Sequence, residues 1–258
     1  MLGNSVIAIG LLLALPALAQ EYTEIPGLPP VPRYKVQRIK EKIIVDGKLS
    51  EKAWAKATPI TLVFPWDSQT GKKQKTIVRL LYEAENLYVG YDCEDSDMTA
   101  VFEKRDDSTF MEDCVEIFIK PSNSSNDYFG LEMNARGTLF DYFYPFPKEI
   151  VKSLDLEGVQ LKTHLLGTLN QRNDQDQGWS LELAIPLKNF AKYAPHTPPT
   201  SGDTWHIQLN RWDGTEDSGG RRLSMWCHSG LKNTHPHNPE RFGVIEFEGG
   251  AGAPAHAR

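Results

Sequence analysis

The strongest constraint on the fold of this chain is a period-two alternation of apolar and polar residues, repeated in short runs along most of the sequence. This period puts successive side chains on opposite faces of a β-strand, and the runs are rich in β-branched and aromatic residues. Gly, Asn, Asp or Pro residues bound the runs, as is typical of turns. We predict strands at Lys42–Val45, Thr76–Tyr82, Leu87–Cys93, Cys114–Lys120, Tyr128–Asn134, Thr138–Tyr144, Val159–Leu166, Trp179–Ile185, Trp205–Trp212 and Phe242–Phe247.

Several of these runs are separated by too few residues for the crossover that parallel neighbours need, so the strands should pair mainly antiparallel. Two short helices are expected, at Glu51–Lys56 after a Ser50 cap and at Leu187–Ala191 after Pro186. The sequence therefore predicts an all-β fold, a mainly antiparallel two-sheet β-sandwich with two short helices, over residues 39–248.

The two ends of the chain differ in composition from this central part. Residues 6–16 form an apolar run too short to cross a bilayer, and Ala17-Leu18-Ala19 follows as a small-x-small cleavage pattern. We therefore predict a signal peptide at residues 1–19, a secreted or periplasmic protein, and no membrane insertion. Residues 20–38, with four prolines, should form an extended segment, and residues 249–258 a flexible tail.

Charge and cysteine content exclude some classes of partner. The formal net charge is −6, and Lys and Arg are scattered rather than gathered into a basic stripe, so nucleic acid is not an expected partner. A monomer is expected. The three cysteines, Cys93, Cys114 and Cys227, match no zinc or haem-attachment spacing. A Cys93–Cys114 disulfide and free thiols both remain open.

A series of short blocks carries a family resemblance. The first is Asp46-Gly47-x-Leu49, completed by Trp54, and the second is the strand Asp113–Ile119 with an aromatic residue three positions before it. Further blocks are Leu131–Thr138, Gly178-Trp179-x-x-Glu182-x-x-Ile185-Pro186, Trp205–Arg211, and Trp226 with His237-x-Pro239-x-x-Phe242-Gly243. Together they resemble the family 9 carbohydrate-binding modules of the DOMON-like β-sandwich superfamily.

This resemblance implies a non-catalytic domain that holds an oligo- or polysaccharide between two aromatic rings. Rings cover the apolar C–H faces of a sugar, while charged and amide groups bind its hydroxyls. The family commonly has Trp where this chain has Phe110, which offers less stacking area. The implied ligand-binding residues are Phe110, Glu116, Asn134, Arg136, Asn210, Arg211 and Trp226.

Structural roles compete with binding at several of these positions. Phe110 could instead pack into the core, and Glu116 could form a surface ion pair with Arg136. Glu182, on an otherwise apolar strand, needs a partner when buried, and Arg211 is a candidate. Trp54, Trp179 and Trp205 are expected in the core.

The resemblance also implies structural calcium, although no cofactor is required. Asp92, Glu94, Asp95 and Asp97 follow a predicted strand and offer the oxygen ligands that Ca²⁺ prefers. A solvated acidic loop is the alternative, because these residues match no EF-hand spacing.

Two other functions remain open. Related sandwiches bind b-type haem through Met and His, for which Met98, Met111, Met133, Met225, His206, His228, His235 and His237 are the raw material. Glycoside hydrolysis needs two carboxylates flanking a sugar, and the candidates are Glu112, Asp113, Glu116 and Asp141.

Overall fold

The computed structural model describes residues 25–215 and 220–249, so the expected signal peptide and nearly all of the expected tail lie outside the described part. Its strands are β1 (Arg33–Arg38), β2 (Ile60–Thr61), β3 (Thr76–Tyr82), β4 (Asn86–Glu94), β5 (Cys114–Lys120), β6 (Tyr128–Asn134), β7 (Leu139–Tyr144), β8 (Gln160–Leu166), β9 (Gly178–Pro186), β10 (Thr204–Asp213), β11 (Arg222–Met225) and β12 (Gly243–Glu248). The 3-10 helices are η1 (Lys52–Lys56), η2 (Thr109–Met111), η3 (Leu187–Phe190) and η5 (Pro239–Arg241).

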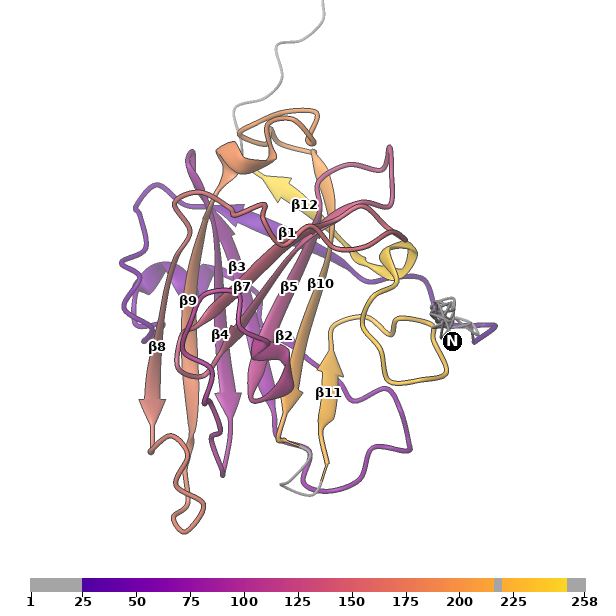
Figure 1. Cartoon of the computed structure of the whole chain (residues 1–258). Coiled ribbons are helices and arrows are strands. Elements are labelled where there is room, and N and C mark those ends of the chain that lie inside the picture. Colours follow the sequence, from indigo (N-terminus) through magenta and orange to yellow (C-terminus); the bar gives the residue numbers. More distant parts are fainter. Residues whose placement is uncertain (1–24, 216–219, 250–258) are drawn as a thin grey trace, which may run out of the picture.

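The predicted all-β sandwich is confirmed, with one difference in how its two faces are joined. Neighbouring strands follow the order β7-β6-β5-β10-β12-β1-β3-β4-β9-β8, while β11 pairs with β10 and β2 with β3. Hydrogen bonding is thus continuous, and the sheet curls so that its two halves face each other (Figure 1). One half is built from β5, β6, β7 and β10, the other from β3, β4, β8 and β9, and β12 and β1 join them.

Strand β1 was not predicted, and it pairs parallel with both β12 and β3. Its residues Tyr34 and Val36 alternate into the core, at 7% and 0% exposure. The segment before it is also attached, since the amide of Ile25 donates to the carbonyl of Gly230 at 2.7 Å. The expected start of the domain at residue 39 therefore lies too far along the chain.

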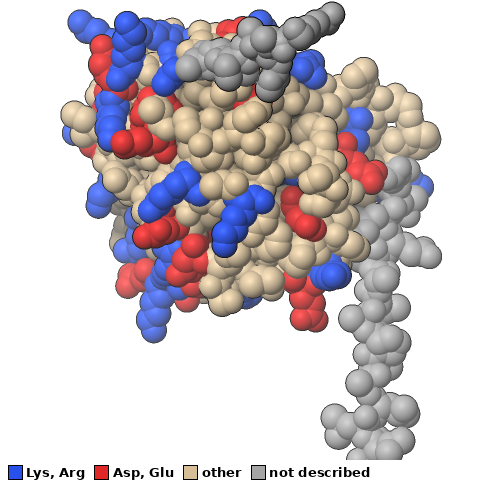
Figure 2. Space-filling model, turned by 90° about the horizontal axis from the view of Figure 1, so that it is seen from above, with Lys and Arg blue, Asp and Glu red and all other residues tan. Residues whose placement is uncertain are grey.

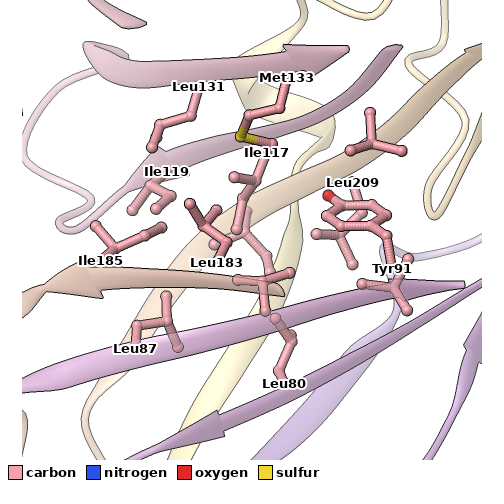
Figure 3. Packing of buried hydrophobic residues seen from close by; sticks show 14 of the residues in the cluster. Leu80, Leu87, Tyr91, Ile117, Ile119, Leu131, Met133, Leu183, Ile185 and Leu209 are labelled. Atoms are coloured by element: carbon pink, nitrogen blue, oxygen red, sulfur yellow. The ribbon is translucent and has the colours of Figure 1, made fainter. Parts of the chain in front are cut away.

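The core fills the space between the two halves of the sheet. Val115, Ile117 and Ile119 alternate inward from β5 and are fully buried. Figure 3 shows Ile117 and Ile119 facing Leu183 and Leu87 from the opposite half. Truncating one such residue to Ala should cost about 2–5 kcal/mol, because the methyl groups leave a cavity.

Residues 39–57 cover the outer face of the β3–β4–β9 half, and their irregular path differs from the prediction. Lys42–Val45 forms no strand, and Ser50 caps no helix, since Glu51 holds the N-cap position of η1 without a side-chain hydrogen bond. The segment is held instead by Ile43 and Trp54, which pack against Tyr88. Both expected helices are short 3-10 helices, of five and four residues.

The Asp46-Gly47-x-Leu49 block binds the side chain of Glu182. Its buried carboxylate accepts hydrogen bonds from the amides of Asp46, Gly47 and Leu49 and from Nε1 of Trp54, at 2.8, 2.9, 3.2 and 2.9 Å. Burial raises the pKa of Glu182, while these donors oppose the rise. The suggested pair with Arg211 was therefore wrong, because backbone donors already satisfy the carboxylate.

The three cysteines are free and buried, which settles the open disulfide question for Cys93 and Cys114. Across the described residues, no helix has the length and apolar character needed to cross a membrane. Positive and negative side chains are interspersed on the face shown in Figure 2.

Candidate ligand-binding site

A cavity of about 370 Å³ opens on the outer face of the β5–β6–β7–β10 half. We call it the aromatic pocket. It is lined by Phe110, Glu116, Glu132, Phe140, Tyr142, Tyr144, Ile150, Trp212, Arg221, His235, Pro236 and His237.

The period-two alternation of the strands places these side chains together. On β5, Glu116 lies between Val115 and Ile117, which point into the core, so its carboxylate points to the outer face. Glu132 on β6 does the same between Leu131 and Met133. The outer-facing residues of four adjacent strands thus form the floor of the aromatic pocket.

A polar row crosses this floor. Asn210, Glu116, Glu132 and Phe140 are direct cross-strand partners along β10, β5, β6 and β7. Nδ2 of Asn210 donates to Oε2 of Glu116 at 3.1 Å, and the hydroxyl of Tyr142 donates to Oε1 of Glu132 at 2.8 Å. Oδ1 of Asn210 and Oε2 of Glu132 are buried and have no hydrogen-bond partner. These two oxygen atoms are therefore available to hydrogen-bond a ligand.

Burial controls the protonation of the two carboxyl groups. It raises the pKa of Glu116 to about 7, although hydrogen bonds from Asn210 and Trp212 and the charge of Arg221 oppose the rise. Burial also raises the pKa of Glu132 well above its ordinary value, and the charge of Glu116 adds to this effect. At neutral pH the pair holds at least one proton, so it can both donate and accept hydrogen bonds.

Aromatic rings form the walls. Phe110 lies 6.1 Å from Phe140, and Phe140 lies 5.2 Å from Tyr142, measured between ring centroids. On the β10 side, the guanidinium of Arg221 lies 4.2 Å from the centroid of the Trp212 ring and donates to the carbonyl of Phe110. These contacts hold Phe110 and Trp212 at the rim of a single concave surface.

Gly130 makes room for Tyr142. A Cβ atom at Gly130 would lie 2.2 Å from Cζ of Tyr142 and 2.5 Å from its hydroxyl. Because β6 carries glycine at this point, the Tyr142 ring crosses the strand and reaches Glu132. The orientation of Tyr142 thus depends on one residue without a side chain.

The loop before η5 closes one side of the aromatic pocket. His237 stacks on Phe118 with ring centroids 4.7 Å apart, and its Nδ1 is 2.6 Å from the hydroxyl of Tyr128. Burial lowers the pKa of His237 to about 3, and the neighbouring His235 adds to the effect. His237 is therefore neutral at physiological pH and fixes the loop rather than supplying charge.

Of the seven implied ligand-binding residues, Phe110 and Glu116 line the aromatic pocket, and Asn210 bonds to Glu116 in its floor. Trp226 lies elsewhere, packed edge-on to Tyr34 at 6.4 Å and over Gly243, where a Cβ atom would come 2.4 Å from its ring. It therefore fills space beside the core and does not line the pocket.

Asn134 and Arg136 hold the loop that follows β4. Asn134 donates to the carbonyl of Phe102 at 2.9 Å and to Glu112 at 2.6 Å. Arg136 donates to the carbonyl of Ala100 and pairs with Glu103, so the suggested ion pair with Glu116 does not form. Both side chains act on loop structure, away from the pocket lining.

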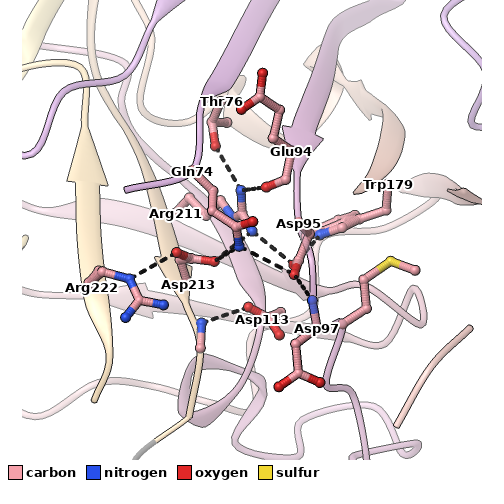
Figure 4. A network of polar contacts seen from close by, with 12 residues as sticks. Gln74, Thr76, Glu94, Asp95, Asp97, Asp113, Trp179, Arg211, Asp213 and Arg222 are labelled. Atoms are coloured by element: carbon pink, nitrogen blue, oxygen red, sulfur yellow. Dashed lines mark hydrogen bonds and ion pairs between the residues drawn. The ribbon is translucent and has the colours of Figure 1, made fainter. Parts of the chain in front are cut away.

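Arg211 lies on the core side of β10, one residue from Asn210 on the pocket side. Its buried guanidinium pairs with Asp95 and Asp213 at 2.9 Å each and donates to the carbonyl of Glu94 at 2.6 Å (Figure 4). Asp113 lies beside this network and accepts from the amides of Thr99 and Gly214. Burial and the charge of Asp95 raise the pKa of Asp113 to about 8.

This network bears on the calcium prediction. Asp92 and Glu94 are exposed on β4, whereas Asp95 is buried against Arg211, so the four predicted ligands do not converge. Among the described residues, Asp95 instead clusters with Asp113 and Asp213. A guanidinium already supplies the positive charge there, and amides donate to the remaining oxygens. The residues therefore do not fit the predicted calcium site.

The residues proposed for other functions are dispersed. Met98 and Met133 lie in the core, on the side of the sheet opposite to His235 and His237. The other candidate carboxylates bind backbone amides: Glu112 accepts from Val101, Asp113 from Thr99, and Asp141 from Leu156, at 2.6 to 2.8 Å. Glu116 alone of the proposed catalytic residues lines the aromatic pocket.

Sequence reasoning missed Glu132, Phe140, Tyr142, Trp212 and Arg221. Trp212 could have been found, because it lies two residues after Asn210 and therefore faces the same side of β10. The positions of Glu132, Phe140 and Tyr142 in the pocket depend on the register of β6 and β7, and that of Arg221 depends on the path of the loop before β11.

Comparisons with known proteins agree with the fold. A family model described as carbohydrate family 9 binding domain-like matches residues 45–250. A Bacteroides uniformis protein, whose description as carbohydrate-binding is provisional, has a TM-score of 0.72 at 18% identity over 84% of this chain and 100% of its own. No curated protein matches the chain significantly.

Two further solved structures are of a family 9 carbohydrate-binding module from Caldicellulosiruptor kristjanssonii. The cellotriose complex has a TM-score of 0.59 at 16% identity, covering 88% of this chain and 97% of that one. The glucose complex has a TM-score of 0.60 at 16% identity, covering 86% and 99%. At such identities these likenesses establish a shared fold.

Proposed function

The chain belongs to the carbohydrate family 9 binding domain-like family, and from this premise we propose that it is a non-catalytic domain that binds a saccharide in the aromatic pocket. The observation that carries the proposal is the combination, in one cavity, of ring walls with a floor of buried carboxyl groups. The structurally similar module that was solved with cellotriose and with glucose supports a sugar as the ligand.

The chemistry of the aromatic pocket suits a sugar. Phe110 and Trp212 offer ring faces to the apolar C–H surfaces of a pyranose. Glu116 and Glu132 offer a shared proton and several acceptor oxygens to its hydroxyls, through hydrogen bonds of the charge-assisted kind. The affinity should be roughly micromolar to millimolar, or about 4 to 8 kcal/mol, because few ligand atoms would be buried.

Binding suits this arrangement better than hydrolysis. Glycosidases place their two carboxyl groups on either side of the scissile bond. Glu116 and Glu132 are direct cross-strand neighbours on one floor, so both would face the same side of a ligand. A bound sugar would therefore rest on the pair rather than lie between its members.

Calorimetric titration with cellotriose tests the proposal, with two tryptophan variants compared. Trp212→Ala should weaken binding at least tenfold, because Trp212 lines the aromatic pocket. Trp226→Ala is the matched control and should bind as the unmodified protein does, since Trp226 packs beside Tyr34. Circular dichroism verifies that both variants fold. Equal effects of the two substitutions, or an absence of saccharide binding, would contradict the proposed site.

We also propose that the protein is exported, on the basis of the apolar run at residues 6–16 and the Ala17-Leu18-Ala19 pattern after it. Mass spectrometry of the protein recovered outside the cytoplasm should give a mature N-terminus at Gln20. Recovery with residues 1–19 still attached would count against export by this route.

A further inference from the structure

We infer that the aromatic pocket recognises an amino sugar, through a primary ammonium group held by the row of Asn210, Glu116 and Glu132. This inference rests on the proposed function, since it names the class of saccharide that the same pocket selects. Three observations carry it: the kind of polar atom left without a partner, the uncharged partners of the two carboxyl groups, and the rings around them.

The floor has two oxygen atoms without a partner, of which Oδ1 of Asn210 is always an acceptor and Oε2 of Glu132 is an acceptor when its carboxyl group is ionised. Oδ1 of Asn210 and Oε2 of Glu132 are buried without a hydrogen-bond partner, and Glu116 lies between these residues on the adjacent strand. The amide of Asn210 is oriented by its own donation to Glu116, which leaves Oδ1 as the free atom. An ammonium group carries three donors and no acceptor, so it complements a row of acceptors better than a hydroxyl does.

The charge of the floor also favours a cation. Asn210, Trp212 and Tyr142, which hydrogen-bond Glu116 and Glu132, are uncharged, while the charges of Arg221 and Lys152 act on the pair from the pocket walls. Both carboxyl groups are at least 97% buried, since their exposures are 1% and 3%. Their raised pKa values reflect the cost of burying negative charge, and a bound cation would offset that cost.

The cations near the aromatic pocket lie against its walls. Arg221 is over the Trp212 ring and donates to a backbone carbonyl, and Nζ of Lys152 is 5.1 Å from the centroid of the Phe140 ring. His235 and His237, which close one side, have pKa values lowered by burial and carry no charge at neutral pH. A positive charge should therefore be stabilised more at the floor, beside Glu116 and Glu132, than at the walls.

The ring walls add to this preference. A cation near a Trp, Tyr or Phe face is attracted by the ring, and more strongly when it is desolvated. An N-acetylated sugar loses the charge and adds an acceptor, and a uronic acid brings a carboxylate toward Glu132. The aromatic pocket should therefore rank amino sugars above neutral sugars and reject acidic ones.

Three trisaccharides with the same β-1,4-linked glucose backbone test the inference: cellotriose, N,N′,N″-triacetylchitotriose and fully deacetylated chitotriose. Calorimetric titrations at about pH 6 keep the amines protonated, and the bound ammonium group then displaces protons that Glu116 and Glu132 hold at this pH. Deacetylated chitotriose should bind at least tenfold more tightly than the other two ligands. Glu132→Gln should remove most of that preference, measured as the ratio of the affinities for deacetylated chitotriose and cellotriose. Glu94→Gln, at an exposed carboxylate outside the aromatic pocket, is the matched control and should keep the preference.

Each outcome is decisive. Binding of cellotriose with no preference for the amine overturns the inference and leaves the proposed function intact, whereas an absence of binding by all three overturns both. A preference that survives in Glu132→Gln, or is lost equally in Glu94→Gln, reflects general attraction to an acidic protein and also overturns the inference. If circular dichroism shows that Glu132→Gln is unfolded, Glu116→Gln is judged by the same criteria.

Discussion

Glu116 and Glu132 face each other across β5 and β6, each hydrogen-bonded to an uncharged side chain from a neighbouring strand. A cross-strand pair of buried carboxyl groups is unfavourable when both are ionised. The pair lies on the outer face of these strands, and the side chains on their other face pack in the core. The fold therefore carries a destabilising feature at the place where we propose a ligand binds.

The first prediction concerns pH. The folded-state pKa of Glu116 is raised to about 7, above the ordinary 4.5, so the folded protein binds more protons than the unfolded chain between these values. Its contribution to stability is present below about pH 4.5 and is lost as pH rises through 7. Urea unfolding at pH 5, 6, 7 and 8 should show the free energy of unfolding falling relative to Glu116→Gln, by roughly 3 kcal/mol at most. Parallel profiles would show that Glu116 does not titrate as stated.

A second prediction compares two glycines with similar positive φ angles. Gly47 and Gly202 have φ values of +88° and +92°, but a Cβ at Gly47 would lie 2.6 Å from the carbonyl carbon of Thr163, whereas nothing lies within 4 Å at Gly202. Gly202→Ala should cost about 1–2 kcal/mol for the left-handed backbone alone. Gly47→Ala should cost several kcal/mol, because the turn must also withdraw from Glu182. Thermal and urea unfolding measure the difference, and similar losses would contradict the argument.

A third prediction separates pocket geometry from stability. Gly130→Ala must displace the Tyr142 ring and break its hydrogen bond to Glu132, so saccharide affinity should fall at least tenfold, or about 1.4 kcal/mol. Gly90→Ala is the matched control. It crowds Leu49 and Trp54 on the other half of the sheet, at 2.4 and 3.3 Å from the added Cβ. It should reduce stability and leave affinity unchanged; a loss of affinity in both variants would mean that the effect is global.

A fourth prediction concerns Arg211. Replacing it with Met leaves Asp95 and Asp213 buried without their shared cation, which should cost about 3–5 kcal/mol in the free energy of unfolding. Lys188→Met breaks an exposed pair with Glu157 and should leave the free energy of unfolding nearly unchanged, because solvent screens the pair. Urea titrations at neutral pH compare the two. A small effect at Arg211 would imply that the aspartates are protonated or solvated when it is absent.

The strands and their inward faces could be predicted from the sequence, because alternation along segments such as Cys114–Lys120 has one consistent apolar side. Strand β1 could not, since the four prolines of residues 20–38 suggest an extended segment and its parallel partners are distant in sequence. Two alternating apolar residues, Tyr34 and Val36, are too few to predict a strand by themselves. Long-range parallel pairing leaves little trace in local sequence.

Of the residues that line the aromatic pocket, Phe110 and Glu116 were expected from the family resemblance of the block around β5. Tyr142 and Glu132 required the register of β5, β6 and β7, which one sequence does not determine. Asn210 and Arg211 are adjacent and so face opposite sides of β10, a distinction that the period-two rule alone could have made.

The position of β1 between β12 and β3 ties the two ends of the domain to each other during folding. Of the described strands, β12 is the last along the chain, and until it is available β1 can pair only with β3. As the chain emerges N-terminus first, hairpins such as β3–β4 and β5–β6 can therefore form early, but the seam closes only after residues 243–248 have emerged. Such distant pairing predicts slow, late closure of the domain, and a chain stopped before β12 should remain open along that seam.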